Sequence, residues 1–499
     1  MKSLFARLCR SIEDHPVRSL VCYMAASIVL WTLQCSLLQH ILSLDALEAI
    51  SWGGEFSWGH AKHPPLSGWV AELFSRLACR ADWGSYLGCQ VMLVTGVWFV
   101  YRTARLFLDR YAAVMSAGLL YFLFYYLPSW MKFSTYFVEI ALAPIAAYCF
   151  FAALEKKKLY LWALLGLVCA LGLLNKYSFG LQIIGLAIVF FAVPEYRKQF
   201  FRPGPWLAAL ICGALLAPHL QWLAAQDFIC LHHVQDRMVE ERNWYDTFTI
   251  LGVILYPFIN AAAVLCLARF PGWKNAERKT PDKGLAFKAI VLTMVPGLFY
   301  LALDLAGNSV IMMWFCTAAS WTGTAVVALF PYKITQVLWR RVYLLLLLAT
   351  LAMFAGTSID LLARTGKRLH MRPEAIVGPA MKFWHTHRKD AVPVVYGSCW
   401  YAGVIKNYTP DRPPVSEVGD PVRFARFRPL MEERGALLIG KPDELEEFAK
   451  LTGFQAQFVE ITAKCKAPWG RARKDRFLVG YYPPRSERAA SPKADAAKK

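Results

Sequence analysis

Long apolar runs, separated by short polar segments, make up the first three quarters of the chain. Several of these runs reach the roughly 20 residues that an α-helix needs to cross the hydrocarbon core of a bilayer. We predict about eleven spanning helices, near residues 19–41, 84–101, 112–128, 134–154, 159–175, 178–193, 206–224, 247–268, 286–304, 309–330 and 342–362. The pattern therefore predicts a polytopic α-helical membrane domain over residues 1–363.

The connections between these segments alternate in charge. If the N-terminus is cytoplasmic, every cytoplasmic loop is basic, as in "EKKK" (155–158) and "RFPGWKNAERKTPDKG" (269–284). Loops rich in Lys and Arg stay on the cytoplasmic side of a membrane. The first apolar run is too long for the core of a signal peptide, so we expect it to remain as a spanning helix.

Beyond residue 363 the chain becomes polar, and we expect this part to lie on the far side of the membrane. Short β-like runs ("VPVVYGS", "GALLIG", "DRFLVGYY") alternate with a helix candidate at 441–453. This alternation predicts a small soluble α/β domain over residues 364–485. The tail at 486–499 has few apolar residues, and we expect it to be disordered.

The composition supports a membrane protein with anionic partners. Only 18% of residues are charged and the mean hydropathy is +0.35, whereas a soluble protein carries about 25% charged residues. The formal net charge of +20 suits membrane lipids with anionic head groups and phosphate-bearing substrates. No basic helix or stacking platform occurs outside the membrane part, which excludes nucleic acid as a partner.

Thirteen cysteines are scattered along the chain. No CxxC pair occurs, so the sequence indicates no zinc or haem site. Cys399 and Cys465 would be able to form a disulfide in an oxidising compartment, but the sequence does not decide whether they pair.

The first outer loop, residues 44–80, is unusually rich in functional side chains. It begins "LDALEAISWGGEFSWGHAKHPPLSGW". An acid such as Asp45 at a helix end is either merely solvated or catalytic. Trp52, Phe56 and Trp58 fit an amphipathic segment that lies in the membrane interface and faces lipid. Two prolines after His63 predict a rigid turn.

Four segments carry a resemblance to a known family. In the first loop, Asp45, Trp52, Trp58-Gly59 and the His63-Pro64-Pro65-Leu66 motif follow one another. The other three are "GLVCALGLLNKYSFGL" (166–181), "LLAPHLQWLAAQDF" (215–228) and "GSCWYAGVIKNYTPDRPPV" (397–415). Together they resemble the membrane glycosyltransferases of the dolichyl-phosphate-mannose–protein mannosyltransferase type, whose bacterial relatives include the aminoarabinose and galacturonic acid transferases of lipid A.

The resemblance implies a fold, a reaction and a location. The fold would be the large helical GT-C type with a C-terminal periplasmic α/β domain. The reaction would transfer a hexose or pentose from a polyprenyl-phosphate donor to an envelope acceptor: lipid A or lipopolysaccharide, another glycan, or a protein. It would occur at the periplasmic face of a bacterial inner membrane. The sequence does not identify the sugar or the acceptor.

The chain departs from the family pattern at two positions of the first loop. The second acid of the family's Asp-Glu pair is Ala46 here, and the residue before His63, often Asp, is Lys62. These changes put a metal bridge between paired acids in doubt. We therefore predict no metal-ligand set and no certain cofactor, although a divalent cation stays open, and Asp45 is left as the catalytic carboxylate.

Three residues have the most specific expected roles. Asp45 would act as the general base or orient the acceptor hydroxyl. Lys176 lies between two apolar runs, and the resemblance places it at the carrier phosphate; the alternative is that it snorkels to the interface. His63 would donate a hydrogen bond to a phosphate oxygen, orient Asp45, or simply hold the turn.

The other candidates for substrate binding are Lys62, Glu139, His219 and Trp58. For His219 a packing role is equally open, and for Trp58 so is a plain interfacial one. Potential metal ligands also occur after the seventh span, at His232, His233, Asp236, Glu240 and Glu241. Their spacing fits no standard zinc site, so we interpret them as a solvated loop face.

Two other classes of function stay open at this point. A lipid-linked sugar transporter or flippase would explain the spans and the basic charge, but it predicts charges paired in mid-membrane and pseudo-repeats. A non-catalytic relative that binds a lipid carrier is conceivable because the second acid is absent.

Overall fold

The computed structural model describes residues 2–127, 132–239, 246–272, 276–363 and 368–490. The chain divides into two units. The first, here called the helical unit, comprises Met1–Leu33, Lys62–Leu66 and Leu87–Gly356. The second, here called the loop-and-sheet unit, comprises Gln34–Ala61, Ser67–Tyr86 and Thr357–Lys499.

The polytopic α-helical fold is confirmed. In the described part of the chain, 8 helical segments are long and apolar enough to cross a membrane. They are α2 (Pro16–Leu38), α5 (Trp83–Ala104), α7 (Thr135–Lys156), α11 (Pro203–Ala225), α13 (Asp246–Arg269), α14 (Lys283–Leu305), the segment Met312–Leu329 that ends in α15 (Thr322–Leu329), and α16 (Gln336–Ala363). The shorter apolar helix α8 (Leu159–Asn175) matches another predicted segment.

Two predicted spans are not straight helices. The segment expected at 112–128 consists of α6 (Arg110–Gly118) followed by the short 3-10 helices η1 (Leu119–Phe122) and η2 (Phe124–Tyr126). The segment expected at 309–330 begins with the 3-10 helices η4 (Met312–Phe315) and η5 (Ala318–Trp321), which precede α15. Helix α9 (Phe179–Ala192) matches the span expected at 178–193, and it meets the following helical segment, Pro194–Phe201, at a bend of 97°. Pro194 lacks an N–H and restricts the residue before it, so α9 ends at this point.

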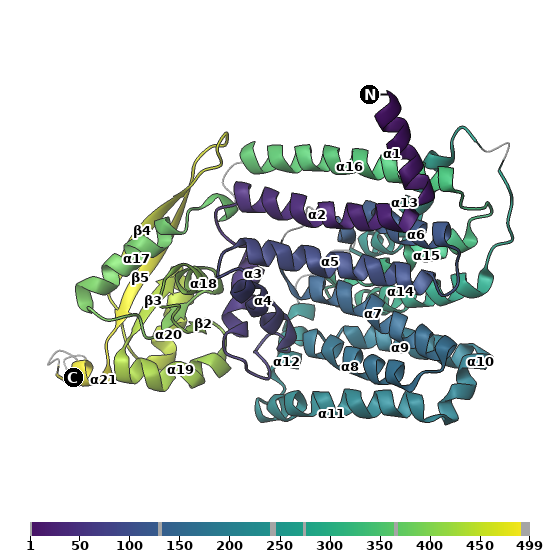
Figure 1. Ribbon diagram of the computed structural model, residues 1–499. Helices are drawn as coiled ribbons and strands as arrows, with labels where there is room; N and C mark the ends of the chain where they lie inside the picture. Colours follow the sequence, from purple (N-terminus) through teal and green to yellow (C-terminus); the bar gives the residue numbers. More distant parts are fainter. Residues whose placement is uncertain (1, 128–131, 240–245, 273–275, 364–367, 491–499) are drawn as a thin grey trace. The chain divides into compact units, whose positions relative to one another are not determined.

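Close side-chain and backbone contacts hold the helical unit together. Tyr23 on α2 hydrogen-bonds Thr350 on α16 at 2.8 Å, and these two helices lie side by side (Figure 1). Helices α8 and α11 also run together (Figure 1). A Cβ at Gly166 would lie 2.4 Å from the carbonyl oxygen of Ala208, so only glycine permits this approach. Small residues are the usual means of close helix packing in membranes.

The C-terminal part contains the predicted α/β structure. Its five strands are β1 (Val395–Gly397), β2 (Val415–Glu417), β3 (Ala436–Gly440), β4 (Phe458–Cys465) and β5 (Arg473–Tyr482). Their order in the sheet is β2-β1-β3-β5-β4. Strand β1 is parallel to β2 and β3, whereas β5 is antiparallel to β3 and β4.

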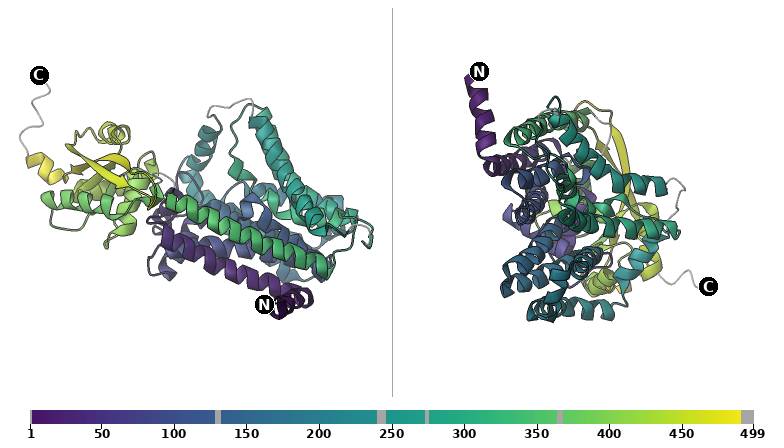
Figure 2. Two further views of the ribbon diagram at one scale, coloured as in Figure 1. Left: turned by 90° about the horizontal axis from the view of Figure 1, so that it is seen from above. Right: turned by 90° about the vertical axis from the view of Figure 1, so that its right-hand side faces the viewer.

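Helices pack on both faces of this sheet (Figure 2). On one face, α19 (Pro421–Arg434) and α20 (Pro442–Thr452) contribute Phe424 and Phe448 to a core that also contains Tyr396 and Tyr482. On the other, α17 (Glu374–His387) and α18 (Cys399–Tyr408) contact Tyr481 and Phe477 of β5. Side chains alternate between the faces of a strand, so both faces need an apolar cover. Helix α20 matches the helix predicted at 441–453.

Two earlier points concern the expected disorder of the tail and the open pairing of Cys399 with Cys465. Residues 486–490 belong to α21 (Arg485–Ala490) and are not disordered. Glu487 on this helix accepts hydrogen bonds from Arg388 at 2.9 Å and from Tyr481 at 3.0 Å, which explains the order. The remainder of the predicted tail lies outside the described residues. Within the described part, no disulfide joins Cys399 to Cys465.

We expect Phe448→Ala to destabilise the C-terminal sheet strongly. The Phe448 ring is 1% exposed, and its centroid lies 4.6 Å from Tyr396 and 5.0 Å from Tyr482. Removing such a ring costs about 3–5 kcal/mol because a cavity remains. Hydrogen exchange of the β3 and β5 amides measures the loss. Leu451→Ala is the matched control, since Leu451 is on the same helix but 44% exposed. An equal effect of both changes would contradict this core.

Candidate functional site

Lys176 has an unusual environment in the helical unit. It caps α8 with extended backbone, at φ −163° and ψ 137°. Its Nζ is buried and has no hydrogen-bond partner among the described residues. Nζ lies 4.4 Å from the ring centroid of Tyr136 and 5.6 Å from that of Trp314. Aromatic faces attract a cation but leave its N–H groups available to an acceptor. A buried ammonium ion of this kind is suited to binding an anion.

Glu139 is the acidic residue that interacts with this lysine. It lies on α7, is 1% exposed, and its charge interacts with Lys176. Its Oε1 accepts a hydrogen bond from Ser178 at 2.9 Å, whereas Oε2 has no hydrogen-bond partner in the described part of the chain. A buried cation needs such a counter-charge. Glu139 is therefore the nearby carboxyl group that faces the Lys176 site, and direct binding of substrate by Glu139 stays a proposal.

Local packing fixes the turn that carries Lys176. A Cβ at Gly172 would lie 2.3 Å from the ring of Phe179, so only glycine allows that ring to pack against α8. The Lys176 N–H donates to the Gly172 carbonyl at 3.0 Å. The Asn175 side chain donates to the carbonyl of Thr135 at 2.9 Å and ties the end of α8 to the start of α7. The predicted motif "LLNKYS" thus forms a rigid corner.

His63 lies in the short loop segment that belongs to the helical unit. Its ring contacts that of His233 edge to face, with 6.4 Å between centroids. His233 is on α12 (Ile229–Met238). Burial is the main cause that lowers the pKa of His63 to about 3, and the positive charges of Lys176, His233, Lys62 and Arg237 lower it further. The ring is therefore neutral near pH 7. It can donate one N–H inside a positive field that attracts anions.

His219 on α11 is surrounded by aromatic residues. Its Nε2 lies 2.9 Å from the Tyr177 hydroxyl, and its ring stacks on Trp222 with 6.0 Å between centroids. The side chain is 1% exposed. These contacts explain the "APHLQW" segment by packing, and a role of His219 in substrate binding stays a prediction.

Asp45 belongs to the loop-and-sheet unit, in the first turn of α3 (Leu44–Gly53). It is exposed, and the positive end of the helix dipole favours its ionised form. Ala46 is only 1% exposed. A carboxylate at position 46 would be buried at a cost, which accounts physically for the missing second acid.

The sequence prediction missed Glu48, which follows Asp45 by one turn of α3. Single ligand atoms of Glu48, Cys399 and Glu417 lie within 4.8 Å of one another. Glu417 is also 3.9 Å from the guanidinium of Arg423, which already supplies a positive charge there, so we propose no metal at this cluster. The i, i+3 spacing of Asp45 and Glu48 was a signal that both share a face. Cys399 and Glu417 carried no such signal.

The tryptophans of the first loop do not all face outward. Trp52 is 2% exposed and stacks on His60, with 5.2 Å between ring centroids. The prediction that it faces lipid is wrong, because its position on α3 turns it into the interior of the unit. Phe56 and Trp58 are exposed. The Trp58 ring contacts that of Trp69 edge to face, with 5.4 Å between the ring centroids. Trp58 therefore keeps both proposed roles, as an interfacial anchor or as a lining of the substrate site.

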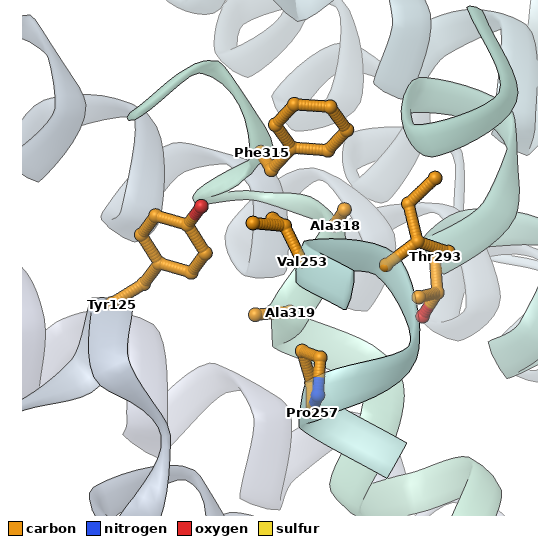
Figure 3. Close-up of a pocket in the computed structure, with 8 residues that line it drawn as sticks. Tyr125, Val253, Pro257, Thr293, Phe315, Ala318 and Ala319 are labelled. Atoms are coloured by element: carbon orange, nitrogen blue, oxygen red, sulfur yellow. The ribbon is translucent and has the colours of Figure 1, made fainter. Parts of the chain in front are cut away.

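Among the ligand-like residues after the seventh span, His232, His233 and Asp236 lie on α12. Glu240 and Glu241 lie outside the described residues. A small hollow elsewhere in the helical unit is lined by Tyr125, Val253, Pro257, Thr293 and Phe315 (Figure 3). Its walls are mostly apolar, and it contains none of the predicted site residues.

We expect a measurable pH dependence from Lys406 on α18. It is 7% exposed, and this burial is the main cause that lowers its pKa to about 8. The positive charges of Arg423 and Arg412 lower the pKa further, whereas the negative charges of Glu55 and Glu72 raise it. Between pH 8 and 10.5 the unfolded chain then binds more protons than the folded chain. The free energy of unfolding therefore rises with pH, by at most about 1.4 kcal/mol per pH unit. The rise should be absent in Lys406→Met when chemical unfolding is compared at pH 7.5 and 9.5. Identical pH dependence in both proteins would contradict the assignment.

Comparison with known proteins finds one matching family model and several similar structures. The family model described as dolichyl-phosphate-mannose-protein mannosyltransferase matches residues 62–222. This range contains His63, Glu139, Lys176 and His219, and the match confirms the predicted resemblance. No curated protein sequence matches the chain at a significant level.

Two solved structures resemble the chain over most of its length. The crystal structure of ArnT from Cupriavidus metallidurans bound to undecaprenyl phosphate has a TM-score of 0.60 at 14% identity, covering 92% of this chain and 97% of that one. The apo state of the same protein has a TM-score of 0.57 at 14% identity, covering 93% and 98%. At this identity the similarity concerns the fold, and it confirms the predicted GT-C architecture of a multi-pass membrane protein.

Proposed function

We propose that this relative of the dolichyl-phosphate-mannose–protein mannosyltransferases is a membrane glycosyltransferase that moves a sugar from a polyprenyl-phosphate donor to an acceptor of the bacterial envelope. The observation that carries the proposal is the buried Lys176 ammonium, which has aromatic neighbours but no hydrogen-bond acceptor among the described residues. Its fit to a phosphate agrees with the family match and with a similar fold that holds undecaprenyl phosphate.

The carrier phosphate gains negative charge during the reaction. In the donor it is a diester with one negative charge, and after the sugar leaves it is a monoester with nearly two. Cations that bind the phosphate therefore stabilise the transition state more than the bound donor, which accelerates the chemical step. Lys176 supplies a charge-assisted hydrogen bond, and neutral His63 supplies a second N–H donor. Lys62 adds to the positive field around His63.

Asp45 is proposed as the general base. The acceptor hydroxyl oxygen attacks the anomeric carbon, the bond from that carbon to the phosphate oxygen breaks, and the hydroxyl proton passes to the Asp45 carboxylate. The carboxylate lies in the first turn of α3, where the helix dipole favours negative charge, as a base requires. No nucleotide is needed for these steps, and a role for a divalent cation stays open.

Mass spectrometry of envelope fractions tests the proposal and identifies the acceptor. Lipid A, lipopolysaccharide core, other glycans and envelope proteins are compared between cells with and without the gene. In cells without the gene, we expect the molecules of one fraction to be lighter by the mass of a single hexose or pentose. A copy of the gene with Asp45→Asn should not restore this mass. Restoration by the Asp45→Asn copy would contradict the assigned base, and an unchanged set of fractions in expressing cells would contradict the function.

A further inference from the structure

The loop-and-sheet unit contains a buried ionic network between the first outer loop and the C-terminal sheet domain. Arg423 on α19 donates to the Ser51 hydroxyl at 3.0 Å and forms an ion pair with Glu55. Lys406 on α18 donates to the Ser51 carbonyl at 3.0 Å. Ser51 is near the end of α3 and Glu55 follows it, so the sheet domain holds the C-terminal end of this helix.

The same domain also holds the chain just before α3. The Leu42 N–H donates to the Tyr408 hydroxyl at 2.9 Å, and that hydroxyl donates to Asp82 at 2.7 Å. Between the two ends, α18 packs directly on α3, because a Cβ at Gly403 would lie 3.1 Å from the Cβ of Leu47. Helix α3 is thus fixed at both ends and along its side, and Asp45 is three residues beyond Leu42.

The charges in this network are expensive to bury. The side chains of Arg423 and Glu55 are 2% and 7% exposed, and Lys406 is 7% exposed. Nε and one terminal nitrogen of Arg423 have no hydrogen-bond partner in the described part of the chain. A well-packed apolar contact would stabilise the interface at least as well. What a buried ion pair adds is a single allowed geometry, because any shift of α3 would leave charges unpaired.

We propose that Arg423, Lys406 and Tyr408 are positioning residues that fix α3 and thereby hold the Asp45 carboxylate at its place in the reaction. The inference rests on the proposed function, in which Asp45 is the base. It assigns the C-terminal sheet domain a part in the chemical step, although none of the three residues touches the reacting atoms.

Kinetics of Arg423→Met in the full-length protein test this role. We expect kcat to fall about 10- to 100-fold, since a displacement of about 1 Å can cost that much. The KM for the polyprenyl-phosphate sugar should change less than about threefold, because Lys176 and His63 are untouched. Arg423→Lys keeps the charge and should recover part of kcat. Arg428→Met is the matched control: Arg428 is an exposed residue of the same helix, and its loss should change neither constant.

A second measurement is independent of activity. Hydrogen exchange of the α3 amides should be faster in Arg423→Met than in wild type while the β3 and β5 amides stay protected, which also shows that the variant is folded. The inference is overturned if α3 keeps its protection, if kcat stays within twofold of wild type, or if Arg423→Lys recovers nothing. A wild-type protein that transfers no sugar, yet loses α3 protection in Arg423→Met, would instead count against the proposed function alone.

Discussion

Asp45→Asn is expected to lower kcat for sugar transfer by about 10²- to 10⁴-fold, the usual contribution of a general base. Asparagine keeps the size and most hydrogen bonds of aspartate but cannot accept the proton of the acceptor hydroxyl. The KM for the polyprenyl-phosphate sugar should change little, because Lys176 and His63 bind the phosphate. The measurement is steady-state transfer by the purified, folded variant.

Glu48→Gln is the control for this prediction. Glu48 lies one turn beyond Asp45 on the same helix, so its change removes a carboxylate from the same part of the protein. We expect less than a tenfold loss. If Glu48→Gln were the inactive variant and Asp45→Asn the active one, the base would be Glu48, and the family resemblance would have led to the wrong carboxylate.

Lys176→Met is expected to lower transfer by about 10²- to 10³-fold, the cost of removing one donor that stabilises developing negative charge. Methionine retains an unbranched side chain that fits between Tyr136 and Trp314, so the loss can be assigned to the charge. Native mass spectrometry should also show weaker binding of polyprenyl phosphate. This reaction product carries more negative charge than the donor, so it too loses the interaction with the Lys176 ammonium group.

Lys132→Met is the control for the phosphate site. Lys132 is an exposed lysine close in sequence to the start of α7, and the same change there should leave transfer and polyprenyl-phosphate binding near the wild-type level. Lys176→Met with normal binding and normal kcat would show that the buried ammonium only stabilises the fold.

The sequence predicted the fold well where the signal was local. Apolar runs of bilayer length marked the spans, and short alternating runs marked the strands around α20. The break at η1 was less visible, because the apolar character continues through it. Trp52 was assigned to lipid since an interfacial tryptophan and one buried under a neighbouring helix have the same local pattern.

The candidate site was predictable only in part. Lys176 was identifiable because a lysine between apolar runs has few ordinary explanations, and Asp45 and His63 were identifiable from the resemblance. The aromatic partner Trp314 is distant in sequence from Lys176, and Arg423 is 368 residues from Glu55. No local pattern connects such residues, so the cation's surroundings and the network on α3 emerged only from the structure.

Transfer by the purified protein in liposomes tests the central claim most directly. The liposomes contain a polyprenyl-phosphate sugar and the envelope fraction that changes with the gene, and both products are followed by mass spectrometry. The account predicts that free polyprenyl phosphate appears in step with a gain of one sugar mass on the acceptor, and that neither appears with Asp45→Asn. A donor that stays intact, or that crosses the bilayer without losing its sugar, would contradict it.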